Sequence, residues 1–183
     1  VRKALEVHDF KETQSVTEFE GRRFMSEVLG VAGWSMDPIL MKQAVNAVTA
    51  WGVSHIVPHG IYMTRQFDGI PWPPDWYNQN PYWPLLHHWT DFARRASFVN
   101  AHGHTVPDVL LMNPMDSIWV LSGNGLFDAD KGGGLGQVEQ WFHPTAREID
   151  AAYSAAINVL TDARTEFLVA DRHYLDQMRV SGR

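Results

Sequence analysis

The sequence predicts an α/β fold built on parallel strands, because four short apolar runs alternate with long amphipathic segments. Polar or turn residues flank each run, as is typical of a buried parallel strand. Two architectures fit this order: a TIM-barrel-like (β/α)8 fold, of which the chain supplies about four β/α units, or an open parallel α/β sheet. After an opening helical stretch at about residues 1–10, the predicted strands are Phe24–Met25, His55–Pro58, Val109–Met112 and Phe167–Ala170.

The three long segments between the strands are predicted to be helices, at about residues 37–51, 83–102 and 144–163. Asp37 can cap the first helix, and Gly103 can end the second. Apolar residues at helical spacing predict which face of the second helix is buried. That face consists of Leu85, Trp89, Phe92, Ala96 and Val99.

Composition is that of one globular domain over residues 1–183, with 45% hydrophobic residues and a net charge of -6. The acidic balance argues against nucleic-acid and anionic-membrane partners, which favour a basic face. Because the chain has no cysteine, disulfides and zinc–thiolate sites are excluded. The compartment stays open, with the bacterial periplasm or exterior favoured. We interpret the chain, which starts at Val1, as a processed chain or an excised barrel segment.

Polar side chains follow the predicted strands, at the sheet edge where ligands bind in both architectures. Glu27 follows the first strand among apolar neighbours that would raise its pKa, and it is the candidate general acid; pairing with Arg22 or Arg23 is the alternative. Asp116 is the candidate base, or it caps the following turn. Asp171 is a second acid/base, a sugar ligand or a partner of a neighbouring arginine.

The loop of residues 65–81 combines flat aromatic side chains with amides, which suits a sugar. Its alternative role is a proline-braced surface loop that packs its own aromatic rings. His59 lies at the end of the second strand and could bond a sugar hydroxyl, whereas His55 fits a sheet position better. The candidate substrate-binding residues are Trp34, His59, Tyr62, Trp76, Asn113, Trp119 and Asp171.

One acidic, glycine-rich segment matches part of the spacing of a calcium-binding loop. Asp128, Asp130 and Glu139 fall at positions one, three and twelve of the EF-hand template. Gly132 departs from the template at position five, where an oxygen ligand is expected, and flanking helices are missing. The alternative is a solvated loop.

Three segments of the chain resemble the catalytic domain of the glycoside hydrolase family 106 alpha-L-rhamnosidases. They are residues 23–38, with the acidic strand end and Gly-Trp; residues 52–60, ending in His-Gly; and residues 107–119, with Pro-Met-Asp-Ser-Ile-Trp. The resemblance covers roughly residues 4–175 and about the second half of the family's barrel. It implies a (β/α)8 barrel, a nearby calcium ion, and inverting hydrolysis of terminal alpha-L-rhamnosides. Asp116 stands where the family's second carboxylate is expected to be Glu.

These observations together predict a glycosidase in which Glu27 protonates the leaving oxygen and Asp116 activates water. The partner is a carbohydrate substrate, and the open edges of a half barrel favour association with a second copy or with the remainder of the barrel. Three alternatives stay open: a retaining glycosidase of another barrel family, a non-catalytic carbohydrate-binding or scaffold fragment, and an open sheet that serves another small ligand.

Overall fold

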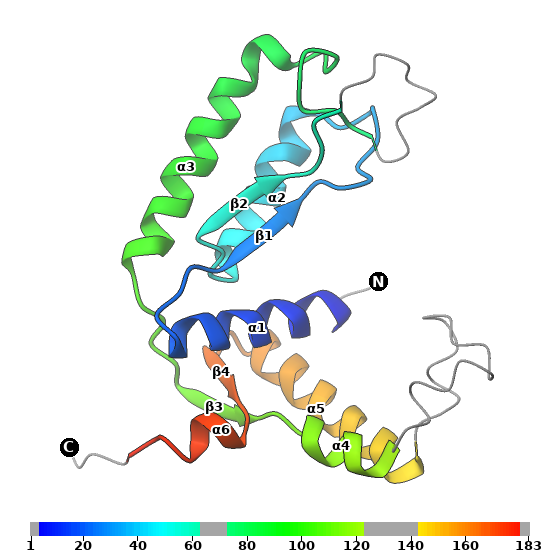
Figure 1. Ribbon diagram of the computed structural model, residues 1–183, viewed down its shortest axis with the longest axis vertical. Helices are drawn as coiled ribbons and strands as arrows, with labels where there is room; N and C mark the ends of the chain where they lie inside the picture. The colour runs from blue at the N-terminus through cyan, green and yellow to red at the C-terminus, as the bar shows by residue number, and fades with distance from the viewer. Residues whose placement is uncertain (1–3, 63–72, 123–142, 180–183) are drawn as a thin grey trace. The chain divides into compact units, whose positions relative to one another are not determined.

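A computed structural model describes residues 4–62, 73–122 and 143–179 of the chain. These residues form a mixed α/β fold with short parallel strand pairs, shown in Figure 1. No helix within these ranges is long and apolar enough to cross a membrane. In chain order the elements are α1 (Ala4–Phe19), β1 (Met25–Val28), α2 (Pro38–Ala50), β2 (His55–Pro58), η2 (Trp83–Leu85), α3 (Leu86–His102), β3 (Val109–Met112), α4 (Met115–Ser122), α5 (Pro144–Asp162), β4 (Phe167–Ala170) and α6 (Arg172–Leu175).

The chain divides into two compact units, and one is inserted in the sequence of the other. Unit 1 comprises Val1–Val16 and Val106–Arg183, and unit 2 comprises Thr17–Thr105. The strands form two separate two-stranded sheets, β1 with β2 and β3 with β4. A single four-stranded sheet is therefore not present in the described ranges, and a closed barrel is not seen there either.

Unit 2 is a β-α-β-α arrangement whose two strands run parallel. The ladder pairs Met25 with His55 at one end and Val28 with Pro58 at the other. Helix α2 begins where the sequence provides a start signal, because the Asp37 side chain accepts a hydrogen bond from the Leu40 amide at 2.7 Å. The core joins both helices and β1 through Phe24, Val28, Met36, Met41, Val45, Val48, Val53, Leu86, Trp89 and Ala93.

Unit 1 pairs β3 with β4 in parallel and covers one face of the pair with α5. Tyr153 and Ile157 of α5 pack against Phe167 and Val169 of β4 in one buried cluster. The Tyr153 hydroxyl donates to the Glu12 carboxylate at 2.9 Å. Burial, reinforced by that carboxylate, raises the pKa of Tyr153 well above its usual value.

Helix α1 covers the edge of β4 that β3 leaves free. The Ser15 hydroxyl accepts a hydrogen bond from the Val169 amide at 2.7 Å, and the Lys11 ammonium donates to the Phe167 carbonyl at 3.0 Å. Lys11 is buried and also pairs with Glu166 at 2.6 Å. Side chains of a helix thus satisfy backbone groups that a neighbouring strand would otherwise bind, and this edge of the sheet is not open.

The two ends of unit 2 meet at one carboxylate. Oε1 of Glu18, near the start of the unit, accepts hydrogen bonds from the Thr105 amide at 3.2 Å and from the Thr105 hydroxyl at 2.8 Å. Thr105 is the last residue of the unit. The Glu18–Thr105 contact therefore closes the inserted unit at its base.

Candidate functional site

The predicted acid, Glu27, lies beside His59 and forms the start of a chain of polar groups. Its Oε1 atom is in hydrogen-bonding contact with Nδ1 of His59. Nε2 of the same ring lies 3.2 Å from the Tyr62 hydroxyl. We call these three residues the relay. Of the alternatives for Glu27, the structure shows a histidine partner, where the sequence suggested an arginine.

The two strands bring the relay together. The β1–β2 ladder places Glu27 opposite Val57, and the His59 amide extends the ladder by donating to the Val28 carbonyl at 3.0 Å. The observed β1 spans Met25–Val28, so Glu27 lies inside the strand, whereas the sequence predicted a strand that ends at Met25. Parallel pairing with β2 holds Glu27 extended, and this contact between chain segments is not visible in local composition.

Close packing at Gly60 determines where Tyr62 lies. Gly60 has φ +80°, which favours glycine, and a Cβ placed there would come within 2.8 Å of the Tyr62 ring. The hydroxyl end of that ring meets His59. Glycine at this position therefore lets the tyrosine ring fold back over the backbone to reach the imidazole.

Asp75 supports the relay, and sequence reasoning missed it. Its side chain is fully buried, and its two carboxylate oxygens accept hydrogen bonds from the Tyr62 amide at 2.9 Å and the Tyr77 amide at 3.1 Å. The bond to an amide two residues along is the Asx-turn pattern, which is the signal that could have found it. Asp75 fixes the backbone of Tyr62 and so orients the last member of the relay.

The acid is more open to water than the sequence predicted. The Glu27 side chain is 58% exposed and His59 23% exposed. Met25, expected to enclose Glu27, is itself exposed. Left-handed backbone follows at Leu29, with φ 65°, and at Val31, with φ 59°. Such conformations are strained for residues other than glycine, and for β-branched valine above all, and they gather at functional sites.

The predicted sugar-binding aromatic residues of unit 2 differ in accessibility. Trp34 is 37% exposed, whereas Trp76 is buried and its ring packs on Trp89 with centroids 4.8 Å apart. The Trp76 amide donates to the Gly60 carbonyl at 3.0 Å. Trp76 therefore joins the loop to the core and leaves little of its ring to a ligand.

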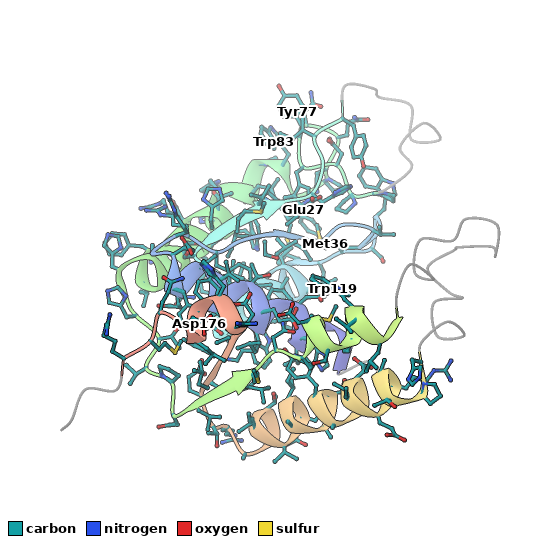
Figure 2. The ribbon with its side chains drawn as sticks, turned by 60° about the horizontal axis from the view of Figure 1, so that its bottom comes forward. Glu27, Met36, Tyr77, Trp83, Trp119 and Asp176 are labelled. Atoms are coloured by element: carbon teal, nitrogen blue, oxygen red, sulfur yellow. The ribbon has the colours of Figure 1, made fainter. Side chains whose placement is uncertain are left out.

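The remaining predicted residues lie in unit 1, after β3 and β4. Asn113 accepts a hydrogen bond from the Met115 amide at 2.9 Å, and Asp116 lies exposed in the first turn of α4. Trp119, labelled in Figure 2, is exposed on the same helix. Asp171 caps α6 by accepting from the Tyr174 amide at 3.2 Å, and Arg172 pairs with Asp176 instead. Asp116 and Asp171 are thus accessible carboxylates at helix N-termini.

The predicted calcium ligands Asp128, Asp130 and Glu139 lie outside the described residues. Within the described ranges, no group of three or more histidine, aspartate or glutamate side chains is arranged to hold a metal ion.

Two hollows in unit 2 lie away from the relay. One, of about 340 Å³, lies between β2 and α3 and is lined in part by Arg23, His55 and Arg94. The other, of about 300 Å³, lies between α2 and the start of α3 and is mostly apolar. Neither is lined by Glu27, His59 or Tyr62. The relay lies outside both hollows, and its Glu27 side chain is largely exposed.

The comparisons with known proteins find no match: no known protein family, no curated protein and no solved structure matches this chain.

Proposed function

We propose that unit 2 carries the acid half of a glycoside hydrolase site, and that the reaction is inverting hydrolysis of terminal alpha-L-rhamnosides. The supporting observation is the relay, in which the Glu27 carboxylate contacts His59 and His59 contacts the Tyr62 hydroxyl. A carboxyl group beside an imidazole combines two groups that can each take up and release a proton, as general acid catalysis requires. The choice of sugar comes from the sequence resemblance.

In this mechanism the Glu27–His59 pair supplies the acidic proton. The pair gives the proton to the glycosidic oxygen as the bond to the anomeric carbon breaks. Water attacks the opposite face of the sugar and gives its proton to the second carboxylate. Tyr62 lies within hydrogen-bonding distance of Nε2 and so supports the imidazole. After the products leave, the second carboxylate releases its proton to solvent and the Glu27–His59 pair takes up one proton from solvent, which restores both groups.

The second carboxylate in the proposal is Asp116, with Asp171 as the other candidate. Both are exposed in unit 1, so water can reach them. The proposal includes a (β/α)8 arrangement, completed by the rest of the barrel or by a second copy, with the parallel strand pairs as its support. It also includes a calcium ion held by Asp128, Asp130 and Glu139, which a calcium titration would test.

The first prediction concerns Glu27→Gln, which keeps the shape of the side chain and removes the acidic proton. We expect kcat on an aryl alpha-L-rhamnoside to fall about 10²–10⁴-fold, the usual contribution of a positioned acid. The control is Glu148→Gln, the same change at an exposed position of α5. Following the anomer of the first product by NMR tests inversion. An unchanged kcat in Glu27→Gln would contradict the assignment.

A second candidate function is carbohydrate binding without turnover. The observation that favours it is the 58% exposure of the Glu27 side chain, because a general acid is usually held in a more enclosed place. Binding of a rhamnoside by the wild-type chain, with no hydrolysis and no effect of Glu27→Gln on affinity, would select this function.

A further inference from the structure

Two exposed aromatic rings form a pair in the segment that follows β2, with Tyr77 in the loop and Trp83 at the start of η2. Tyr77 and Trp83 are 44% and 43% exposed, and their ring centroids lie 4.9 Å apart at an angle of 71° between planes. Figure 2 labels the two side chains next to each other. Rings that meet near a right angle make a corner, in which a flat ligand can lie on one ring and touch the edge of the other.

A buried polar network fixes the backbone beneath this pair. Asp75 accepts the Tyr77 amide, and the amide nitrogen of the Asn80 side chain donates to the Asp75 carbonyl at 2.8 Å. Asn80 is buried, and its side-chain oxygen accepts from the Tyr82 amide at 2.9 Å, while its carbonyl accepts from the Trp83 amide at 2.9 Å. The backbone that carries the pair is thus held by buried polar side chains, which lowers the cost of ordering this segment when a ligand binds.

The same carboxylate also joins the pair to the relay. One oxygen of Asp75 accepts the Tyr62 amide, and the other accepts the Tyr77 amide. The backbones of a relay residue and of a pair residue are therefore separated by a single carboxylate group. Tyr62 and the aromatic corner are thus anchored to the same buried side chain.

We propose that the Tyr77–Trp83 pair binds the leaving group of the glycoside, and that this group carries a flat ring. The proposal rests on the proposed function for the location of the bond that is cleaved. Almost half of each ring stays exposed, although buried hydrogen bonds hold the backbone beneath them. An apolar ring face is what such a corner recognises, and an aryl group attached to the rhamnose would provide it.

The test compares two probes that share the sugar and differ in the leaving group: 4-nitrophenyl and methyl alpha-L-rhamnopyranoside. Calorimetric titration is carried out in the full chain with Glu27→Gln, so that neither probe is consumed. We expect the aryl probe to bind about tenfold more tightly than the methyl probe. In Trp83→Ala and in Tyr77→Ala the ratio should fall toward one, and Trp83→Phe should retain most of it.

The control is Phe98→Ala, which removes an aromatic ring that is 63% exposed on α3 in the same unit and leaves the pair intact. Tyr77→Ala retains the backbone amide that Asp75 binds, so the loop is expected to keep its form, and circular dichroism checks this. An aryl preference that survives Trp83→Ala, falls equally in Phe98→Ala, or is absent from the parent chain overturns the proposal. If Trp83→Ala loses the aryl preference and the wild-type chain shows no turnover, the Tyr77–Trp83 pair is a binding site for the aryl group but the proposed hydrolase function is wrong. If the wild-type chain turns over the substrate and Trp83→Ala keeps the aryl preference, the hydrolase function stands and the role of the pair is wrong.

Discussion

At the scale of single residues, Gly60 and Gly21 offer a matched test of the relay. Both have positive φ, at +80° and +60°, so alanine is strained at either position. Only at Gly60 does the added Cβ meet another group, the Tyr62 ring at 2.8 Å, whereas nothing lies within 4 Å at Gly21. We expect Gly60→Ala to displace Tyr62 from His59 and to lower kcat at least tenfold, as measured by steady-state hydrolysis.

Gly21→Ala should lower stability by about 1–2 kcal/mol through the backbone alone and leave kcat unchanged. Equal effects of the two substitutions on kcat would mean that the position of Tyr62 does not matter. Thermal unfolding of both variants separates the loss of stability from the loss of activity.

The sequence predicts the ionisable members of the relay and misses the residues that hold them. Glu27 and His59 stand next to apolar runs, and this pattern identified both as strand-end groups. Asp75 and Asn80 lie in a loop rich in proline and aromatic residues, where polar side chains suggested contact with a ligand. In the structure each accepts a hydrogen bond from the backbone amide two residues further along the chain. These bonds depend on the conformation of the loop, which composition alone does not predict.

At the scale of elements, the contact of α1 with β4 can be tested by Ser15→Ala. The Ser15 hydroxyl is the hydrogen-bond acceptor for the Val169 amide, and both residues are buried. Without it the amide loses its partner, and we expect unit 1 to lose about 1–3 kcal/mol of unfolding free energy. Val16→Ala, at a 46% exposed position of the same helix, should change it by less than about 0.5 kcal/mol in urea unfolding. Equal losses would contradict a specific role for the hydroxyl.

The elements themselves were largely predictable, because strands and caps leave local signals. The bounds of β2, β3 and β4 agree with the predicted apolar runs, and Asp37 caps α2. The predicted buried face of α3 is wrong in part: Leu86, Trp89 and Ala93 are buried, while Leu85 and Val99 are exposed. The actual face includes Asn100, whose amide donates to the Thr49 and Val53 carbonyls. A prediction that uses only the spacing of apolar residues overlooks a polar residue that packs toward the core through its hydrogen bonds.

At the scale of the whole molecule, the two units have separate cores, and we expect them to differ in their ability to fold as isolated fragments. Unit 2 is continuous in sequence, from Thr17 to Thr105, whereas unit 1 needs both of its segments. We expect a fragment of residues 17–105 to melt cooperatively when monitored by circular dichroism. A fragment of residues 106–183 lacks Ser15 and Lys11, which bind the edge of β4. We expect this fragment to show no cooperative melting. The opposite pattern would contradict this division of the chain.

The pairing of strands is the part of the fold that could not be predicted from the sequence. Alternation of strands and helices predicted one parallel sheet, but it does not state which edges meet. Here a helix, α1, binds the free edge of β4 through side chains that come more than 150 positions earlier, since Ser15 and Val169 are 154 residues apart. Contacts of such range have no local signature.

The Glu18–Thr105 contact has a consequence for how this chain could be rearranged. Entry to and exit from unit 2 share one carboxylate, so the two ends of the unit lie side by side. A segment with adjacent ends has the topology of a cassette. It can be transplanted into a surface turn of another protein, or joined end to end and opened at a new position, with linkers of only a few residues.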